Sequence, residues 1–177
     1  MIYTFEGPMF AGKTSALVEA ALKVKGEAFK PAIDSRYDKS DIVTHDGQRI
    51  KAEAIESLWP ITNKDCPLFL DEAQFFDTIE LAVLVVFRQT RKLDTYLSFL
   101  DYYSNGDRTP IARMFDEYVK NYPDKILRAG FLAECKFCGA VAGRTLRLAD
   151  NKNNNFIGGA ESYAPACSRC WVENRRD

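Results

Sequence analysis

The chain has 177 residues, enough for one globular domain or for one core with a small satellite. Its 46% hydrophobic and 12% aromatic residues are those of an ordinary globular protein, and its formal net charge of -1 provides no overall field that would favour nucleic acid or an acidic membrane. No apolar run is long enough to span a bilayer, and the first residues already form a predicted strand. We therefore expect a cytoplasmic protein without a signal peptide.

The first fourteen residues contain a phosphate-binding motif. A predicted strand over residues 1–5 precedes an octapeptide that fits G-x-x-x-x-G-K-[ST], namely Gly7-Pro8-Met9-Phe10-Ala11-Gly12-Lys13-Thr14. A helical pattern begins at its last residue. Backbone N–H groups of such a loop surround phosphate oxygens, the lysine reaches the β- and γ-phosphates, and the threonine hydroxyl binds Mg²⁺. The alternative is a glycine-containing turn before a surface helix.

Strands and helices alternate along the next part of the chain. We predict further strands at 30–34, 67–70 and 94–100, and helices at 14–29, 56–63, 78–91 and 111–122. The polar residues 35–47 are predicted to form a long functional loop, which includes the only histidine, His45. A lone histidine in a polar loop is more often solvated than catalytic. The alternation predicts an α/β fold, with a RecA-like parallel P-loop sheet and helices on both faces over residues 1–131.

The predicted strand at 67–70 ends in two adjacent carboxylates. An apolar strand of this kind delivers acidic side chains to the carboxyl edge of a parallel sheet, where ligands bind. Asp71 would then hold Mg²⁺ near Thr14, and Glu72 would act as the general base. In the alternative interpretation, the two acidic residues only stabilise the N-terminus of the following helix.

Four of the five cysteines have the spacing of a metal site. Cys135-x-x-Cys138 and Cys167-x-x-Cys170 can offer four thiolates to one ion, which predicts a tetrahedral, structural Zn²⁺ site. The long segment between the pairs must project as a loop. A disulfide pair or a redox-active C-x-x-C is the alternative. We expect a small zinc-ribbon domain over residues 132–177. Within it, Gly158-Gly159 allows close backbone approach to a ligand, although these residues alone favour a plain turn beside a packed tyrosine.

Five motifs together carry a resemblance to a known family. In chain order they are the octapeptide 7–14, Asp34-Ser35-Arg36-Tyr37, Thr44-His45, Asp71-Glu72-Ala73-Gln74-Phe75-Phe76, and the run from Ile157-Gly158-Gly159 through Tyr163 to the second cysteine pair. With these motifs, the sequence resembles the type II thymidine kinases, the zinc-containing group typified by the cytosolic human enzyme and its bacterial counterparts.

The resemblance implies a role for each matched residue. Glu72 would deprotonate the thymidine 5′-hydroxyl. The octapeptide would hold ATP and Mg²⁺, and the same nucleotide side would include Asp34, Ser35, Arg36, Asp71 and Gln74. A lasso segment would hydrogen-bond the thymine through its backbone, while a tyrosine closes over the nucleoside; the corresponding residues are Asn154, Asn155, Phe156, Ile157, Gly158 and Tyr163. The resemblance further implies a homotetramer whose partners are ATP and thymidine, with no nucleic acid or membrane.

One stretch departs from the family pattern. Family members carry G-L-D-x-D-F-R-G-x-P-F on the strand that follows D-E-x-Q-F-F, and the first phenylalanine of that pattern packs on the base. Here residues 99–106 retain only Leu100-Asp101, and either Tyr102 or Tyr103 could supply the aromatic ring. We therefore predict ATP-dependent phosphorylation of thymidine, with deoxyuridine also accepted. Two alternatives remain: a P-loop ATPase with a nucleic-acid-binding zinc ribbon, and a family member that binds nucleosides without catalysis.

Overall fold

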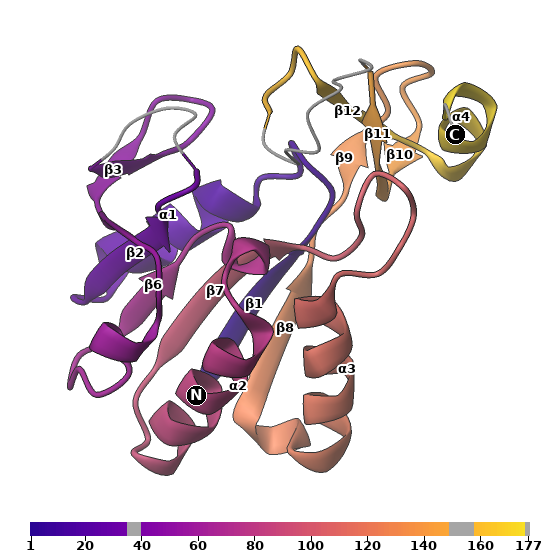
Figure 1. Cartoon of the computed structure of the whole chain (residues 1–177). Helices are drawn as coiled ribbons and strands as arrows, with labels where there is room; N and C mark the ends of the chain where they lie inside the picture. Colours follow the sequence, from indigo (N-terminus) through magenta and orange to yellow (C-terminus); the bar gives the residue numbers. More distant parts are fainter. Residues whose placement is uncertain (35–39, 149–157, 176–177) are drawn as a thin grey trace.

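A computed structural model describes residues 1–34, 40–148 and 158–175 (Figure 1). Its centre is a sheet of six strands, all parallel, in the order β5-β2-β6-β7-β1-β8. The strands in this order are Glu53–Ile55, Glu27–Pro31, Leu68–Leu70, Thr95–Leu100, Ile2–Gly7 and Ile126–Gly130. The predicted parallel α/β fold is confirmed, and two strands, β5 and β8, extend the sheet beyond the four that were predicted.

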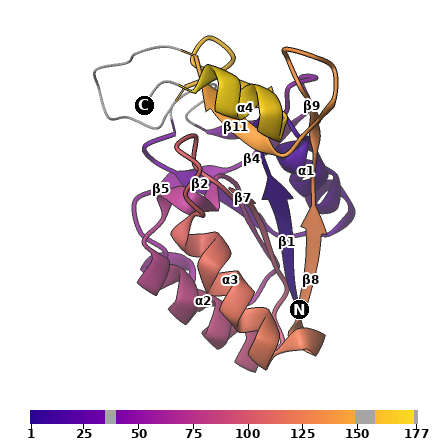
Figure 2. The same cartoon turned by 90° about the vertical axis from the view of Figure 1, so that its right-hand side faces the viewer.

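Helices cover both faces of this sheet, as predicted. Helix α1 (Lys13–Lys23) lies on one face, while α2 (Thr78–Thr90) and α3 (Pro110–Asn121) lie side by side on the other (Figure 2). Side chains alternate along the strands, so each face buries its own apolar cluster. Leu17 and Val18 of α1 pack with Phe69 and Tyr96, whereas α2 and α3 pack on Ile2, Leu68, Leu70, Leu97 and Phe99. None of the helices in the described ranges is both long and apolar enough to cross a membrane.

Three local predictions between residues 14 and 63 were wrong. The helix predicted at 14–29 ends at Lys23, because strand β2 begins at Glu27 and pairs with β6; the strand that was predicted at 30–34 therefore lies earlier and ends at Pro31. The predicted loop 35–47 contains β3 (Asp41–Val43), which pairs with β4 (Arg49–Lys51). The helix predicted at 56–63 is a single 3₁₀ turn, Trp59–Ile61, with Pro60 in its first positions. For the two predicted helices, strand pairing or proline geometry prevails over the local helical pattern; for the predicted loop, strand pairing prevails over polar composition.

The cysteine-containing segment forms a small unit above the carboxyl ends of the central strands (Figure 1). Its described residues form four short strands and one helix: β9 (Ala133–Glu134), β10 (Val141–Ala142), β11 (Arg144–Arg147), β12 (Tyr163–Ala166) and α4 (Ser168–Asn174). Its own core joins two of the cysteines to apolar residues of these elements, namely Cys135, Ala142, Leu146, Ala166, Cys170 and Trp171. The division into domains at residue 131 stays a prediction.

Candidate active site

The octapeptide forms a tight loop between β1 and α1. Gly12 precedes the helix in the left-handed region at φ 86°, and a Cβ added there would meet nothing within 4 Å, so the space beside the loop is open. At the other end, a Cβ on Gly7 would lie 2.3 Å from the carbonyl oxygen of Phe131. Both positions therefore require glycine. The backbone N–H of Met9 donates to Thr145 Oγ1 at 3.0 Å, which joins the loop to β11 of the cysteine-containing unit.

Lys13 is buried within the loop. Its Nζ donates a hydrogen bond of 2.6 Å to the carbonyl oxygen of Pro8. The ammonium thus lies across the concave side of the loop, at the N-terminus of α1, where backbone amides and the helix dipole favour an anion. This is the position from which a lysine of this motif reaches the outer phosphates of a nucleotide.

Asp71 is buried at the end of β6, beside the start of α1. It accepts hydrogen bonds from Thr14 Oγ1, at 3.1 Å and 3.3 Å to its two oxygens, and from the Ser98 hydroxyl of β7. Burial, with a smaller contribution from the charge of Glu72, raises the pKa of Asp71 to about 6. Asp34 is buried nearby and adds a further repulsion. This concentration of carboxylate oxygens beside a threonine hydroxyl is the donor set that Mg²⁺ prefers.

Glu72 projects from the sheet edge in an unusual backbone conformation. It has φ 50° and ψ 41°, in the left-handed region that non-glycine residues rarely adopt, and such strain is concentrated at functional sites. The Gln74 side chain donates to the Glu72 carboxylate, and Gln74 Oε1 accepts the backbone N–H of Leu100 at 3.1 Å. Gln74 therefore fixes the direction of the Glu72 carboxylate relative to β7.

Glu72 lines one cavity, and Gln74, its hydrogen-bond partner, lines a second one. The larger, of about 350 Å³, is lined by the phosphate-binding loop and by residues outside it: Met9, Phe10, Ala11, Gly12, Lys13, Thr14, Ser15, Val43, His45 and Glu72. The smaller is lined by Met9, Gln74, Phe75, Leu100, Tyr103, Ser104, Thr145 and Tyr163. Sequence reasoning missed Val43, Phe75 and Thr145, and it gave His45 no role. Of these, His45 and Phe75 had a signal, as residues of the T-H motif and of the motif at 71–76.

The other predicted site residues are distributed as follows. Gly158 packs so closely on Ser162 and Tyr163 that an added Cβ would lie 2.7 Å from the Ser162 Cβ. Gln74, predicted on the nucleotide side, lies on the wall of the smaller cavity. Several predicted residues fall outside the described parts of the chain, namely Ser35, Arg36, Asn154, Asn155, Phe156 and Ile157.

The two tyrosines of the divergent stretch have different surroundings. The ring of Tyr102 lies under the guanidinium of Arg144, at 4.2 Å from the ring centre, with Arg108 at 5.0 Å. Tyr103 instead lines the smaller cavity with Tyr163. Tyr103, and not Tyr102, is thus the aromatic residue placed toward the cavity.

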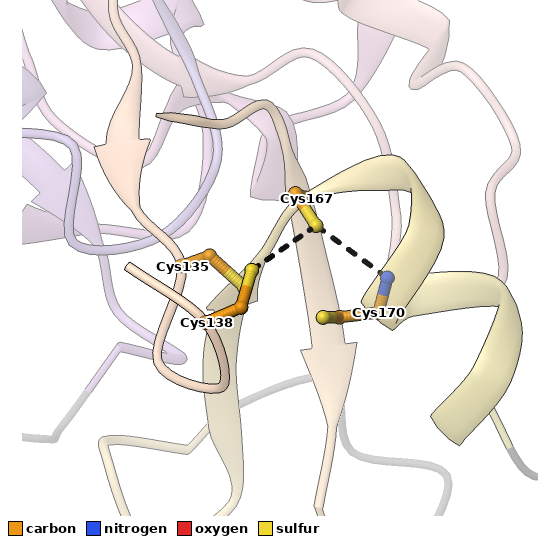
Figure 3. A group of neighbouring side chains, drawn as sticks. All are labelled: Cys135, Cys138, Cys167 and Cys170. Atoms are coloured by element: carbon orange, nitrogen blue, oxygen red, sulfur yellow. Dashed lines mark hydrogen bonds between the residues drawn. The ribbon is translucent and has the colours of Figure 1, made fainter. Parts of the chain in front are cut away.

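The four predicted metal ligands converge (Figure 3). The Sγ atoms of Cys135, Cys138, Cys167 and Cys170 all lie within 4.8 Å of one another, and those of Cys138 and Cys167 are 3.7 Å apart. Zinc–sulfur bonds of about 2.3 Å in a tetrahedron place sulfurs about 3.8 Å apart, so the cluster fits Zn²⁺. With four protein ligands, such a site has no open coordination position and is structural.

Comparison with known proteins agrees with this geometry. The family model described as "Thymidine kinase" matches residues 1–97 and 114–171. The chain belongs to the thymidine kinase family. A thymidine kinase from Rhodothermus sp. (strain ITI 518) is 28% identical over 185 residues, which cover 96% of this chain and 80% of that protein. The family resemblance seen in the sequence is confirmed, and neither comparison favours the nucleic-acid-binding ATPase. The family match omits residues 98–113, which include the divergent stretch and Tyr103.

Proposed function

We propose that this protein transfers the γ-phosphate of ATP to the 5′-hydroxyl of thymidine. One observation carries the assignment of the site: Glu72 lines the phosphate-binding cavity, while Gln74, which donates to the Glu72 carboxylate, lines the smaller cavity together with Tyr163. A base in this position can meet a hydroxyl that enters from one cavity while the phosphate approaches from the other. Membership of the thymidine kinase family supports the choice of substrates.

The donor half of the proposed mechanism uses the loop backbone and Lys13. The phosphates of ATP would bind the amides at the N-terminus of α1, and the Lys13 ammonium would exchange the Pro8 carbonyl for phosphate oxygens. Mg²⁺ bound with ATP would neutralise charge on the phosphates. Thr14 and Asp71 would hold it, with Asp34 close by. Ser35 and Arg36 are assigned to this side by resemblance alone.

The acceptor half uses Glu72 as general base. Its carboxylate would take the proton of the 5′-hydroxyl as the oxygen attacks in line, while Gln74 keeps the carboxylate in place. Tyr163 and Tyr103 would enclose the nucleoside, with Met9, Phe75 and Thr145 completing the wall. The lasso role of Asn154, Asn155, Phe156, Ile157 and Gly158 is proposed from the resemblance. Deoxyuridine lacks only the methyl group of thymidine and should be accepted.

The zinc site has a structural part in this proposal. Its two cysteine pairs flank residues 139–166, so one ion would fix both ends of the segment that covers the nucleoside. Zinc holds this frame and takes no part in phosphate transfer. By resemblance we also propose a cytoplasmic homotetramer.

The decisive test is a coupled assay of ADP formation by the purified protein with a panel of deoxynucleosides. Thymidine and deoxyuridine should be phosphorylated efficiently and deoxycytidine and deoxyguanosine poorly. Equal rates with deoxycytidine or deoxyguanosine would overturn the assignment. ATP hydrolysis that is stimulated by DNA, without phosphorylation of thymidine, would support the P-loop ATPase with a nucleic-acid-binding zinc ribbon instead.

A further inference from the structure

We propose that Trp171 is a positioning residue that fixes the nucleoside-binding wall, by holding the segment Asp101–Thr109 against the cysteine-containing unit. We call this segment the docking loop. The proposal rests on the proposed function, because it assigns Trp171 an effect on thymidine binding. The docking loop lies in the residues 98–113 that the family match leaves uncovered, whereas Trp171 lies within the matched residues.

The indole N–H of Trp171 joins two segments that are distant in sequence. Nε1 donates to the carbonyl oxygen of Ser104, at 3.1 Å, and to that of Thr145, at 3.2 Å. Ser104 belongs to the docking loop and Thr145 to β11, and both line the smaller cavity. A single buried donor therefore holds together two neighbouring parts of the wall that faces the nucleoside.

The indole ring of Trp171 also packs directly against the docking loop. Gly106 has φ +92°, and an added Cβ would lie 2.8 Å from Cη2 of Trp171, so only glycine allows this contact. Arg144 extends the contact, because its guanidinium lies 4.2 Å from the centre of the Tyr102 ring and 5.7 Å from that of Trp171. Such cation–π contacts stabilise partly buried stacks.

The other side of the docking loop is anchored to the central sheet. Arg108 forms a two-point ion pair with Asp116 of α3, and Arg128 of β8 connects Asp116 to Glu6 at the end of β1. Thr109 Oγ1 donates to the carbonyl oxygen of Leu100 at 2.7 Å. The loop is thus held at its base by the sheet and at its tip by Trp171, and Tyr103 lies between the two anchors.

This placement makes Trp171 a link between the metal ligands and substrate binding. Trp171 follows Cys170 directly and is buried in the small core of the cysteine-containing unit. Its position depends on that unit, while its two acceptors belong to the cavity wall. Loss of the indole N–H should therefore loosen Tyr103 and weaken thymidine binding without touching the phosphate-binding loop.

The test compares Trp171→Phe with Trp59→Phe, a change of the chain's only other tryptophan, which is exposed on the 3₁₀ turn at 59–61. Phenylalanine keeps an apolar ring but removes the donor. We expect Trp171→Phe to raise the KM for thymidine about five- to tenfold, from the loss of a donor shared by two carbonyls, with the KM for ATP and kcat within about twofold of wild type. Trp59→Phe should change none of these constants.

Gly106→Ala tests the same contact from the loop side, with the indole intact. Its added methyl group would collide with Trp171, so it should raise the thymidine KM in the same way. Zinc content and circular dichroism verify that each variant folds and retains its metal. Folded, zinc-loaded variants with an unchanged thymidine KM would overturn the proposal, as would equal changes in the constants for both substrates.

Hydrogen exchange tests the anchoring role of Trp171 independently of the proposed thymidine kinase activity. The docking-loop amides of Tyr103, Gly106 and Thr109 bond within the loop and to Asp101, and they should exchange faster in Trp171→Phe than in wild type. If the wild type does not phosphorylate thymidine but the exchange result holds, the function fails and the anchoring role stands. Unchanged exchange in the loop would refute the anchoring role whatever the activity.

Discussion

The proposed phosphate-binding cavity is lined mainly by one continuous stretch, residues 9–15, with Val43, His45 and Glu72 added from elsewhere. The proposed nucleoside-binding cavity shares Met9 with it but otherwise collects residues from β7, β11, β12 and the segments after β6 and β7. The first uses mainly backbone groups, whose positions follow from glycine conformation and the start of a helix. The second uses side chains whose positions depend on contacts between distant segments. Local chemistry thus determines the donor half, and tertiary packing determines the acceptor half.

In the proposed mechanism Glu72 acts on both halves, so its substitution should have the largest effect. Glu72→Gln keeps the size of the side chain but removes the base, and we expect kcat to fall by about 10²–10⁴ with little change in ATP affinity. Steady-state kinetics and calorimetric ATP titration measure both quantities. Glu19→Gln, at an exposed position of α1, is the matched control. An unchanged kcat would remove Glu72 from the mechanism.

Cys167→Ser should damage the acceptor half while sparing the donor half. Loss of one thiolate weakens the four-sulfur site, and we expect loss of bound zinc and a rise of the thymidine KM by about tenfold or more, with the ATP dissociation constant nearly unchanged. Metal analysis and kinetics on the same preparation test this. Cys66→Ser, outside the cluster, is the control. A zinc-free variant with full activity would show that the metal does not support the nucleoside side.

Tyr103→Ala probes the wall itself. Loss of an aromatic ring beside a base should raise the thymidine KM about five- to fiftyfold, given the usual strength of base–aromatic stacking. Tyr103→Phe keeps the ring and should stay within about threefold of wild type. Comparable losses in both variants would mean that the hydroxyl, rather than the ring, makes the important contact.

Asp71→Asn should stabilise the protein while lowering activity. Because the folded-state pKa of Asp71, about 6, is above the ordinary value of 3.8, its ionised form destabilises the fold above pH 6, and this penalty disappears below pH 4. The variant should therefore have a Tm a few degrees above wild type at pH 8, a gain that shrinks as the pH falls through 6 toward 4.

Asp116→Asn should change the Tm in the opposite direction when both variants are melted at pH 8. The neighbouring Arg108 and Arg128 lower the pKa of Asp116 to about 2, so the ionised form stabilises the fold above pH 4 and the variant should lose stability at pH 8. If both variants shift the Tm in the same direction at pH 8, the assigned environments of these carboxylates are wrong.

The difference between local chemistry and tertiary packing also explains what could be predicted from the sequence. The octapeptide, Asp71-Glu72 and the cysteine pairs carry their chemistry in short spacings, and the structure brings each group together as the spacing predicts. Strands β5 and β8 were missed because their short runs are recognisable only through pairing with β2 and β1. The sequence could not show which of Tyr102 and Tyr103 faces the cavity. That depends on how the docking loop packs on Trp171, and Trp171 is 67 residues from Ser104 in the sequence.

The hydrogen bond between Lys13 and Pro8 has a consequence for ligand discrimination. Since this ammonium already has a carbonyl partner at 2.6 Å, an incoming nucleotide gains only the difference between that bond and a charge-assisted bond to phosphate. A monophosphate that does not extend to the lysine leaves the resting bond intact and gains nothing there. We therefore expect the loop to bind nucleotides whose phosphate chain extends to Lys13 in preference to monophosphates.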